Sequence, residues 1–167
     1  MKIYTKTGDF SYTKYKGKMI SKGEELFELF GVIDEAQAYI DFASNFTIGH
    51  KKFLTEISSI LYKIMGSFYS ENTDSPHLEA ILEEATVELE EGIDYIESAK
   101  PFGHNFLVLN SNKTTAALNI ARVNVRRMER FLAAYKQTHV VNSSILIFVN
   151  RLSDYLYALA FFYGDEQ

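Results

Sequence analysis

The sequence predicts an all-α fold, a five-helix bundle that follows an irregular amino-terminal segment. Apolar residues recur three and four positions apart in five long stretches, which is the spacing of a helix that buries one face. The joints between these stretches are short, and the chain contains only two prolines. A length of 167 residues suits one domain and no repeat or linker divides it, so we expect residues 1–167 to form a single domain.

The helices are expected, in chain order, at residues 24–46, 51–69, 76–98, 115–137 and 143–163. The apolar stripes of the first three contain, in order, Leu29, Ile33 and Ile40, then Leu54, Ile57 and Leu61, then Ile81, Ala85 and Leu89. Pro76 suits the first turn of the third helix, and Asp74 or Ser75 suits its cap. The first twenty residues and residues 102–112 lack the helical period, so we expect loops there.

Composition limits the classes of protein to which the chain can belong. Without cysteine it has no disulfide, thiolate metal site or cysteine nucleophile, and we expect it in the cytoplasm. The amino terminus lacks the apolar core of a signal peptide, and no run approaches the roughly eighteen apolar residues of a membrane span. A net charge of -5 argues against nucleic acid as a partner. The four histidines lack metal-ligand spacing, so we assign no metal ligands.

A short polar stretch near the amino terminus combines groups that can bind phosphates. It contains Thr5, Lys6, Thr7, Gly8 and Asp9. Backbone amides exposed at a glycine turn can hold phosphate oxygens together with a lysine, and hydroxyl or carboxylate oxygens can bind Mg²⁺ directly or through water. The other interpretation is an ordinary turn, since glycine beside aspartate is common in turns.

One face of the fourth expected helix carries three arginines spaced by four residues: Arg122, Arg126 and Arg130. Like charges at this spacing repel by about 0.2–0.5 kcal/mol per pair, so something should neutralise them. Glu129 and solvent are one answer. The other is that the face meets a carboxylate of the first helix, such as Asp34 or Glu35, and the phosphates of a ligand.

Polar residues also interrupt the apolar fifth helix, at Asn150, Arg151 and Asp154. Buried polar groups need hydrogen-bond partners, so a helix interior that admits them has a reason. These residues either form a structural polar pair across the bundle or line a site, and the sequence leaves both interpretations open.

Five short patterns occur in order along the chain. Residues 5–13 follow T-[RK]-x-G-D-x-G-x-T, and residues 20–22 are similar to Val-Ser-Lys. Residues 31–37 are similar to G-x-V-D-E-L-N. Residues 121–130 reproduce A-R-x-x-x-R-R-x-E-R in full, and residues 149–160 follow I-N-R-L-S-D-x-L-[FY]-x-L-A. Over essentially the whole chain, these patterns resemble those of the ATP:corrinoid adenosyltransferases of the propanediol-utilisation type.

Two segments depart from that family pattern. Ser11 stands where the loop pattern has its second glycine. Residues 106–112 stand where the family has F-x-L-P-x-G-G, so the proline and both glycines are absent, and Asn119 replaces the histidine that follows. Phe106 keeps the aromatic position. The alternatives to an active enzyme are a degenerate, non-catalytic ATP- or corrinoid-binding member of the same fold and, more simply, a helical interaction module.

The resemblance implies an enzyme that transfers the 5′-deoxyadenosyl group of ATP to the cobalt of cob(I)alamin, giving adenosylcobalamin and triphosphate. ATP, Mg²⁺ and cobalamin are the implied ligands. Members of the family are homotrimers with the nucleotide site between subunits, so a homotrimer is implied as well. We expect neither a membrane nor nucleic acid as a partner.

The resemblance also implies roles for individual residues. It implies that triphosphate and Mg²⁺ are bound by Thr5, Lys6, Thr7, Gly8, Asp9, Thr13 and Lys22. The nucleotide site would be completed by Arg126, Glu129 and Asn150. The catalytic group would be Arg126 together with Arg122, Asp34 and Phe106. In it, Arg122 pairs with Asp34, and Phe106 packs beneath the corrinoid to displace its lower axial ligand.

Overall fold

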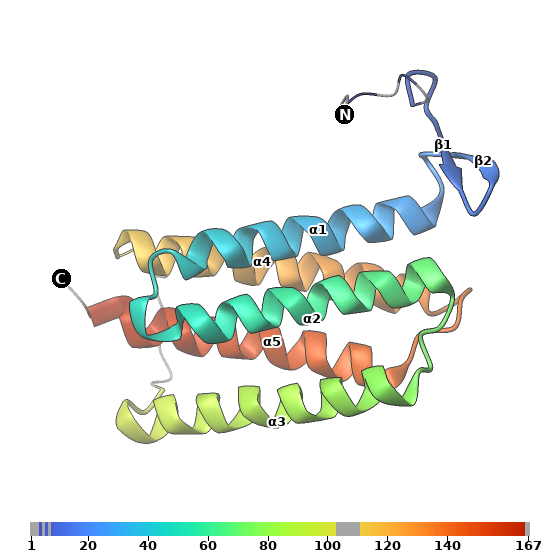
Figure 1. Ribbon diagram of the computed structural model, residues 1–167. Coiled ribbons are helices and arrows are strands. Elements are labelled where there is room, and N and C mark those ends of the chain that lie inside the picture. The colour runs from blue at the N-terminus through green and yellow to red at the C-terminus, as the bar shows by residue number, and fades with distance from the viewer. Residues whose placement is uncertain (1–3, 5, 7, 103–110, 166–167) are drawn as a thin grey trace.

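The computed structural model describes residues 4, 6, 8–102 and 111–165. These residues form five helices that lie side by side in one bundle (Figure 1): α1 Glu25–Ser44, α2 Lys51–Ser70, α3 Pro76–Ala99, α4 Lys113–Tyr135 and α5 Ser143–Phe162. Short 3₁₀ turns, η1 Ile48–His50 and η2 Tyr163–Asp165, follow α1 and α5. The expected all-α bundle is confirmed, and each helix begins and ends within two residues of its expected position.

Helix α5 is the most extensively buried helix of the bundle. It packs against α3 and α4, while α1 packs against α2 and α4. Phe148, Leu152 and Leu156 of α5 are fully buried and belong to one apolar core with the stripes of the other helices. By length and hydropathy α5 could cross a membrane, which the sequence analysis does not expect. Because 61% of its apolar window is buried inside the bundle, its composition is that of a core helix.

A β-hairpin precedes α1, where the sequence predicts only loop. Strands β1 Tyr12–Tyr15 and β2 Lys18–Ser21 pair antiparallel. Lys16 and Gly17 form the turn, and their φ angles of 46° and 82° are both positive, as a type I′ turn requires. The prediction of loop for the first twenty residues is wrong at residues 12–20, because strands of four residues are too short to show a clear alternating pattern.

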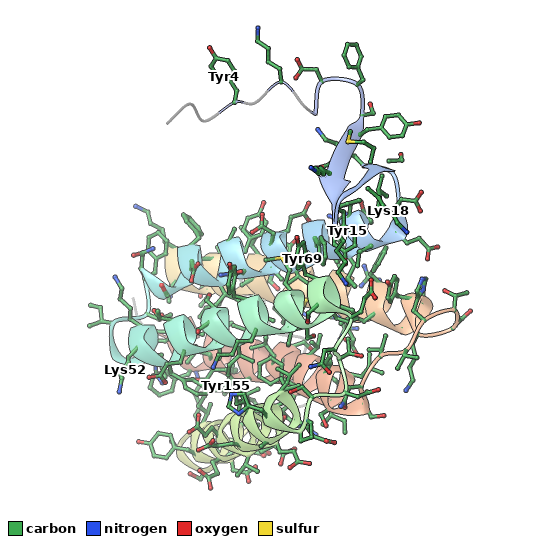
Figure 2. The ribbon with its side chains drawn as sticks, turned by 45° about the vertical axis from the view of Figure 1, so that its right-hand side comes forward. Tyr4, Tyr15, Lys18, Lys52, Tyr69 and Tyr155 are labelled. Atoms are coloured by element: carbon green, nitrogen blue, oxygen red, sulfur yellow. The ribbon has the colours of Figure 1, made fainter. Side chains whose placement is uncertain are left out.

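The hairpin extends beyond the amino-terminal end of α1, away from the bundle (Figure 1), and Tyr15 fixes it at its base. The Tyr15 hydroxyl donates to the carbonyl oxygen of Tyr69 at 2.7 Å, and the two rings meet edge to face. Figure 2 shows both side chains where the hairpin meets the bundle. The Tyr15 ring also packs edge to face on Phe27. The polar loop that precedes the hairpin is therefore carried on a projecting arm with an aromatic base.

Asn112 caps α4, which begins two residues earlier than expected. Its side chain accepts a hydrogen bond from the Thr115 amide at 2.9 Å, and the Thr115 hydroxyl accepts one from the Asn112 amide at 3.1 Å. This reciprocal pair satisfies two backbone donors at the helix start. Asn112 Nδ2 also donates to the Tyr163 carbonyl at 2.8 Å, and the Ser111 hydroxyl donates to the Gly164 carbonyl at 3.0 Å. Residues that replace the family's glycines thus fix the start of α4 to η2.

Candidate active site

The polar loop at the amino terminus is closed by its own lysine. Lys22 Nζ donates to the carbonyl oxygen of Gly8 at 2.9 Å, and the Lys22 amide donates to the carbonyl oxygen of Ser11 at 2.8 Å. A Cβ atom on Gly8 would lie 2.8 Å from Lys22 Nζ, so any other residue here would require the lysine ammonium to move. Lys6, Asp9 and Thr13 lie in the same segment, whereas Thr5 and Thr7 lie outside the described residues. The loop therefore places one cation beside its backbone.

Ser11 adopts the backbone conformation that explains the family's glycine. Its φ angle is 63°, in the left-handed region that side chains disfavour by roughly 1–2 kcal/mol. The loop retains a glycine-like turn although it lacks the glycine. The departure at Ser11 therefore costs conformational energy and leaves the turn itself in place.

The three arginines on one face of α4 differ in their contacts with the rest of the described chain. Arg126 and Arg130 are exposed and form no ion pair with any other described residue. Arg122 is half-buried, and its Nε and Nη2 atoms donate to Oδ1 of Asn119 at 3.1 and 2.8 Å. Burial lowers the pKa of Arg122, and the nearby charge of Arg126 lowers it further. Two exposed cations and one half-buried cation are therefore available on this face.

The predicted pair of Arg122 with Asp34 is not formed within the chain. Asp34 is exposed on α1, and no ion pair between described residues joins it to Arg122. The carboxylates of α1 that do meet α4 are those of Glu35 and Glu28, and both pair with Arg127, at 3.1 Å in the case of Glu28. Arg127 lies off the stripe of arginines spaced by four, on the side of α4 that meets α1.

Glu129 and Asn150 are brought together across α4 and α5. Asn150 Nδ2 donates to Glu129 Oε1 at 2.8 Å, one helical turn beyond Arg126 on α4. The polar residues of α5 therefore divide between the two interpretations that the sequence leaves open. Arg151 has a structural role, because it binds Glu90 of α3 at 2.9 Å and Asp154 at 3.0 Å. The expectation that these side chains interrupt a buried surface is wrong for Asn150 and Asp154, which are exposed.

The described residues thus form two separate groups. Lys6, Gly8, Asp9, Thr13 and Lys22 belong to the projecting arm, which we call the loop group; Arg126, Glu129 and Asn150 lie on α4 and α5, and we call them the helix group. No hydrogen bond or ion pair between described residues joins the two groups. Figure 1 shows the arm extending away from α4 and α5. Within the described part of one chain, the predicted nucleotide residues are therefore not brought together.

Phe106 lies outside the described residues. Sequence reasoning also missed one residue of this region, Asn119, although its spacing of three from Arg122 is that of neighbours on a helix face. Its departure from the family's histidine is visible in the sequence, but its contact with Arg122 appears only in the structure.

The chain is similar in sequence to known corrinoid adenosyltransferases. The sequence model of the family described as cobalamin adenosyltransferase matches residues 3–163. The corrinoid adenosyltransferase MMAB of Bos taurus is 35% identical over 170 residues, which cover 95% of this chain and 70% of that protein. The corrinoid adenosyltransferase of Bacillus subtilis is 31% identical over 168 residues, which cover 96% of this chain and 85% of that protein.

Solved structures give the same result. A variant of the PduO-type ATP:corrinoid adenosyltransferase of Lactobacillus reuteri, complexed with cobalamin and ATP, matches with a TM-score of 0.84 and 28% identity over 98% of this chain and 91% of that chain. A second variant, complexed with ATP, matches with a TM-score of 0.85 and 28% identity over 97% and 94%. The match in sequence and fold spans nearly all of the chain, which therefore belongs to the cobalamin adenosyltransferase family.

Proposed function

We propose that this chain transfers the 5′-deoxyadenosyl group of ATP to the cobalt of cob(I)alamin. The observation that carries the proposal is the helix group, in which an exposed Arg126 without an ion pair in the described chain lies one turn from the linked Glu129 and Asn150. The relatives named above support the same function, and two variants of one of them have structures with ATP. The loop group adds a lysine beside an exposed backbone turn.

In this reaction the cobalt of cob(I)alamin attacks C5′ of ATP with its electron pair. A cobalt–carbon bond forms, the bond from C5′ to the phosphate oxygen breaks, and triphosphate leaves with that electron pair. Negative charge therefore grows on the leaving oxygen. Arg126 is the cation that stabilises this charge, because a residue already held in place before the reaction does so at the least cost, whereas Lys22 binds the phosphates of ATP.

Mg²⁺ fits the loop group by the chemistry of its oxygens. The described residues contain no group of three or more His, Asp or Glu side chains that could hold a metal ion. A divalent cation that is bound mainly by phosphates needs only one or two protein ligands, and the Asp9 carboxylate and the Thr13 hydroxyl of the loop group are oxygens of that kind. When bound, the ion neutralises part of the triphosphate charge.

The two groups come together, in this proposal, in a homotrimer. The loop group of one copy completes the helix group of the next, and Arg122 of one copy pairs with Asp34 of another. Support comes from apolar side chains exposed in the arm and next to the helix group: Phe10 of the arm is 84% exposed, and Ile147, one turn before Asn150 on α5, is 54% exposed. Burial of such side chains favours association.

Phe106 is assigned to the lower face of the corrinoid by its position in the family pattern. The segment that carries it ends at Ser111 and Asn112, whose side chains bind the backbone of η2. The missing glycines are thus replaced by a cap and an anchor, which supports retention of the segment's role.

The cytoplasmic location that the sequence predicts for this protein stays a prediction.

The test is anaerobic incubation of the protein with ATP, Mg²⁺ and chemically reduced cobalamin. We expect light-sensitive adenosylcobalamin and triphosphate in equal amounts. Tight binding of ATP and cobalamin without either product would contradict the enzyme and establish the non-catalytic binding protein. Absence of binding of both Mg²⁺-ATP and cobalamin would contradict the enzyme and the binding protein alike, and would leave the helical interaction module.

A further inference from the structure

The guanidinium group of Arg122 has a hydrogen-bond partner along one edge and an aromatic ring against one face. No carboxylate of the described chain neutralises its charge. Its Nε and Nη2 atoms both donate to Oδ1 of Asn119, one turn earlier on α4, at 3.1 and 2.8 Å. On the α5 side, its Cζ atom lies 6.0 Å from the centre of the Tyr157 ring. A neutral amide and an aromatic face therefore set the orientation of a half-buried cation and leave its charge uncompensated.

The contacts leave a defined part of the guanidinium group available. Arginine carries five N–H donors in a plane, and Asn119 accepts one from Nε and one from Nη2. Three donors remain, and two of them, one on Nη1 and one on Nη2, point outward from the edge between these atoms, which matches the two oxygens of a carboxylate. Arg126, the neighbouring cation one turn on, raises the benefit of an incoming negative charge.

We infer that Asn119 is a positioning residue, which holds Arg122 so that its outer edge binds a carboxylate from a second copy of this chain. The inference rests on the proposed function, in which that carboxylate belongs to Asp34. Asp34 is exposed on α1 and has no ion pair with another described residue, so its charge is available for such a contact. The neutrality of Asn119 is essential, because an acidic residue there would pair with Arg122 within its own chain.

Because residue 119 must be neutral, an acidic substitution there gives a test in which the chain stays as stable as before while its copies associate more weakly. Asn119→Asp keeps the acceptor oxygen and adds a negative charge beside Arg122, three residues before it on the same helix. The melting temperature should therefore stay the same or rise. Because Arg122 would then be neutralised within its own chain, the dissociation constant of the assembly should rise at least about tenfold, and the adenosylation rate should fall by a similar factor.

Asn124→Asp is the matched control. Asn124 also lies on α4, where its Nδ2 atom donates to the carbonyl oxygen of Ile120 at 2.9 Å, and it has no contact with Arg122. The variant places the same charge on the same helix. The dissociation constant of its assembly and its adenosylation rate should stay within about twofold of the wild type. This result would show that the effect of Asn119→Asp depends on a charge next to Arg122 and not on an added charge anywhere on the helix.

Sedimentation of the protein without ATP or cobalamin measures assembly independently of turnover. Weaker assembly of Asn119→Asp, with Asn124→Asp unchanged, supports the inference even if the wild type forms no adenosylcobalamin and the proposed function fails. A monomeric wild type overturns the inference. So does an Asn119→Asp variant that assembles like the wild type. If this variant does not fold, Asn119→Ala replaces it: it frees the side chain of Arg122, and unchanged assembly would overturn the inference in the same way.

Discussion

The loop group and the helix group of the candidate site are held in place by different means. Lys22 is held by contacts with its own loop, through Gly8 and Ser11, on an arm that extends away from the bundle. Glu129 and Asn150 lie on two long helices that pack against each other, and a direct hydrogen bond joins them. The loop must exchange its internal contact for a phosphate contact when ATP binds, whereas the helix group is already placed. We therefore expect the loop to control affinity and the helices to control rate.

The largest effect is expected in the helix group, from Arg126→Ala. Loss of a cation that stabilises leaving-group charge should slow adenosylcobalamin formation about a hundredfold, on the order of 3 kcal/mol of transition-state stabilisation. Because Arg126 is exposed and makes no ion pair with described residues, the melting temperature should change by less than about 2 °C. Rate and thermal unfolding are measured on the same sample. An unfolded variant would show that Arg126 serves the fold instead.

Gly8→Ala tests the loop group and should have the next largest effect. The new Cβ atom would meet Lys22 Nζ at 2.8 Å and push the lysine away from its place over the loop. ATP affinity, measured by calorimetry, should fall about tenfold, which is roughly 1.4 kcal/mol. The rate at saturating ATP should change little. A Gly8→Ala variant with normal ATP affinity and a slow adenosylation rate would contradict the claim that the loop group controls affinity.

Arg127→Ala is a control for the helix group, from the same helix. Arg127 pairs with Glu28 and Glu35 at the surface, so its loss should lower the free energy of unfolding by less than about 1 kcal/mol. Adenosylation should stay within about twofold of the wild type. A loss of rate as large as that of Arg126→Ala would extend the catalytic face around α4 toward α1.

Ser11→Gly should have the smallest effect. Glycine removes the cost of the left-handed conformation at φ 63°, roughly 1–2 kcal/mol, but it also makes the unbound loop more flexible by roughly 0.5–1 kcal/mol. ATP should bind with equal or slightly higher affinity, by about threefold at most. Weaker binding in the calorimeter would mean that the serine hydroxyl itself takes part in binding.

The helices could be predicted from sequence because each has a long apolar stripe with the helical period. The hairpin could not, because Tyr12–Tyr15 and Lys18–Ser21 are each four residues long and their turn is Lys-Gly. Nor could the start of α4, where Asn112 belongs to a segment without periodicity and acts through its side chain.

The site could be predicted in part. The spacing of Arg122, Arg126 and Arg130 correctly places them on one face, and the pairing of Asn150 with Glu129 follows once both are on packed helices. The partner of Arg122 could not be predicted, because a cation in a helix face can be oriented by any acceptor one turn away, and here Asn119 is closer than any carboxylate of the described chain.

The central claim is that the loop group and the helix group of different copies form one site. The direct measurement uses two variants that are both impaired at low ATP concentration, Lys22→Ala in binding and Arg126→Ala in rate. They are dissociated together and allowed to reassemble as mixed assemblies, which are assayed at that ATP concentration. In a ring of copies, about a quarter of the sites then combine an intact loop group with an intact helix group. We predict that the mixture recovers a corresponding share of wild-type adenosylation. A mixture as inactive as either variant alone, in assemblies shown to contain both, would contradict the claim.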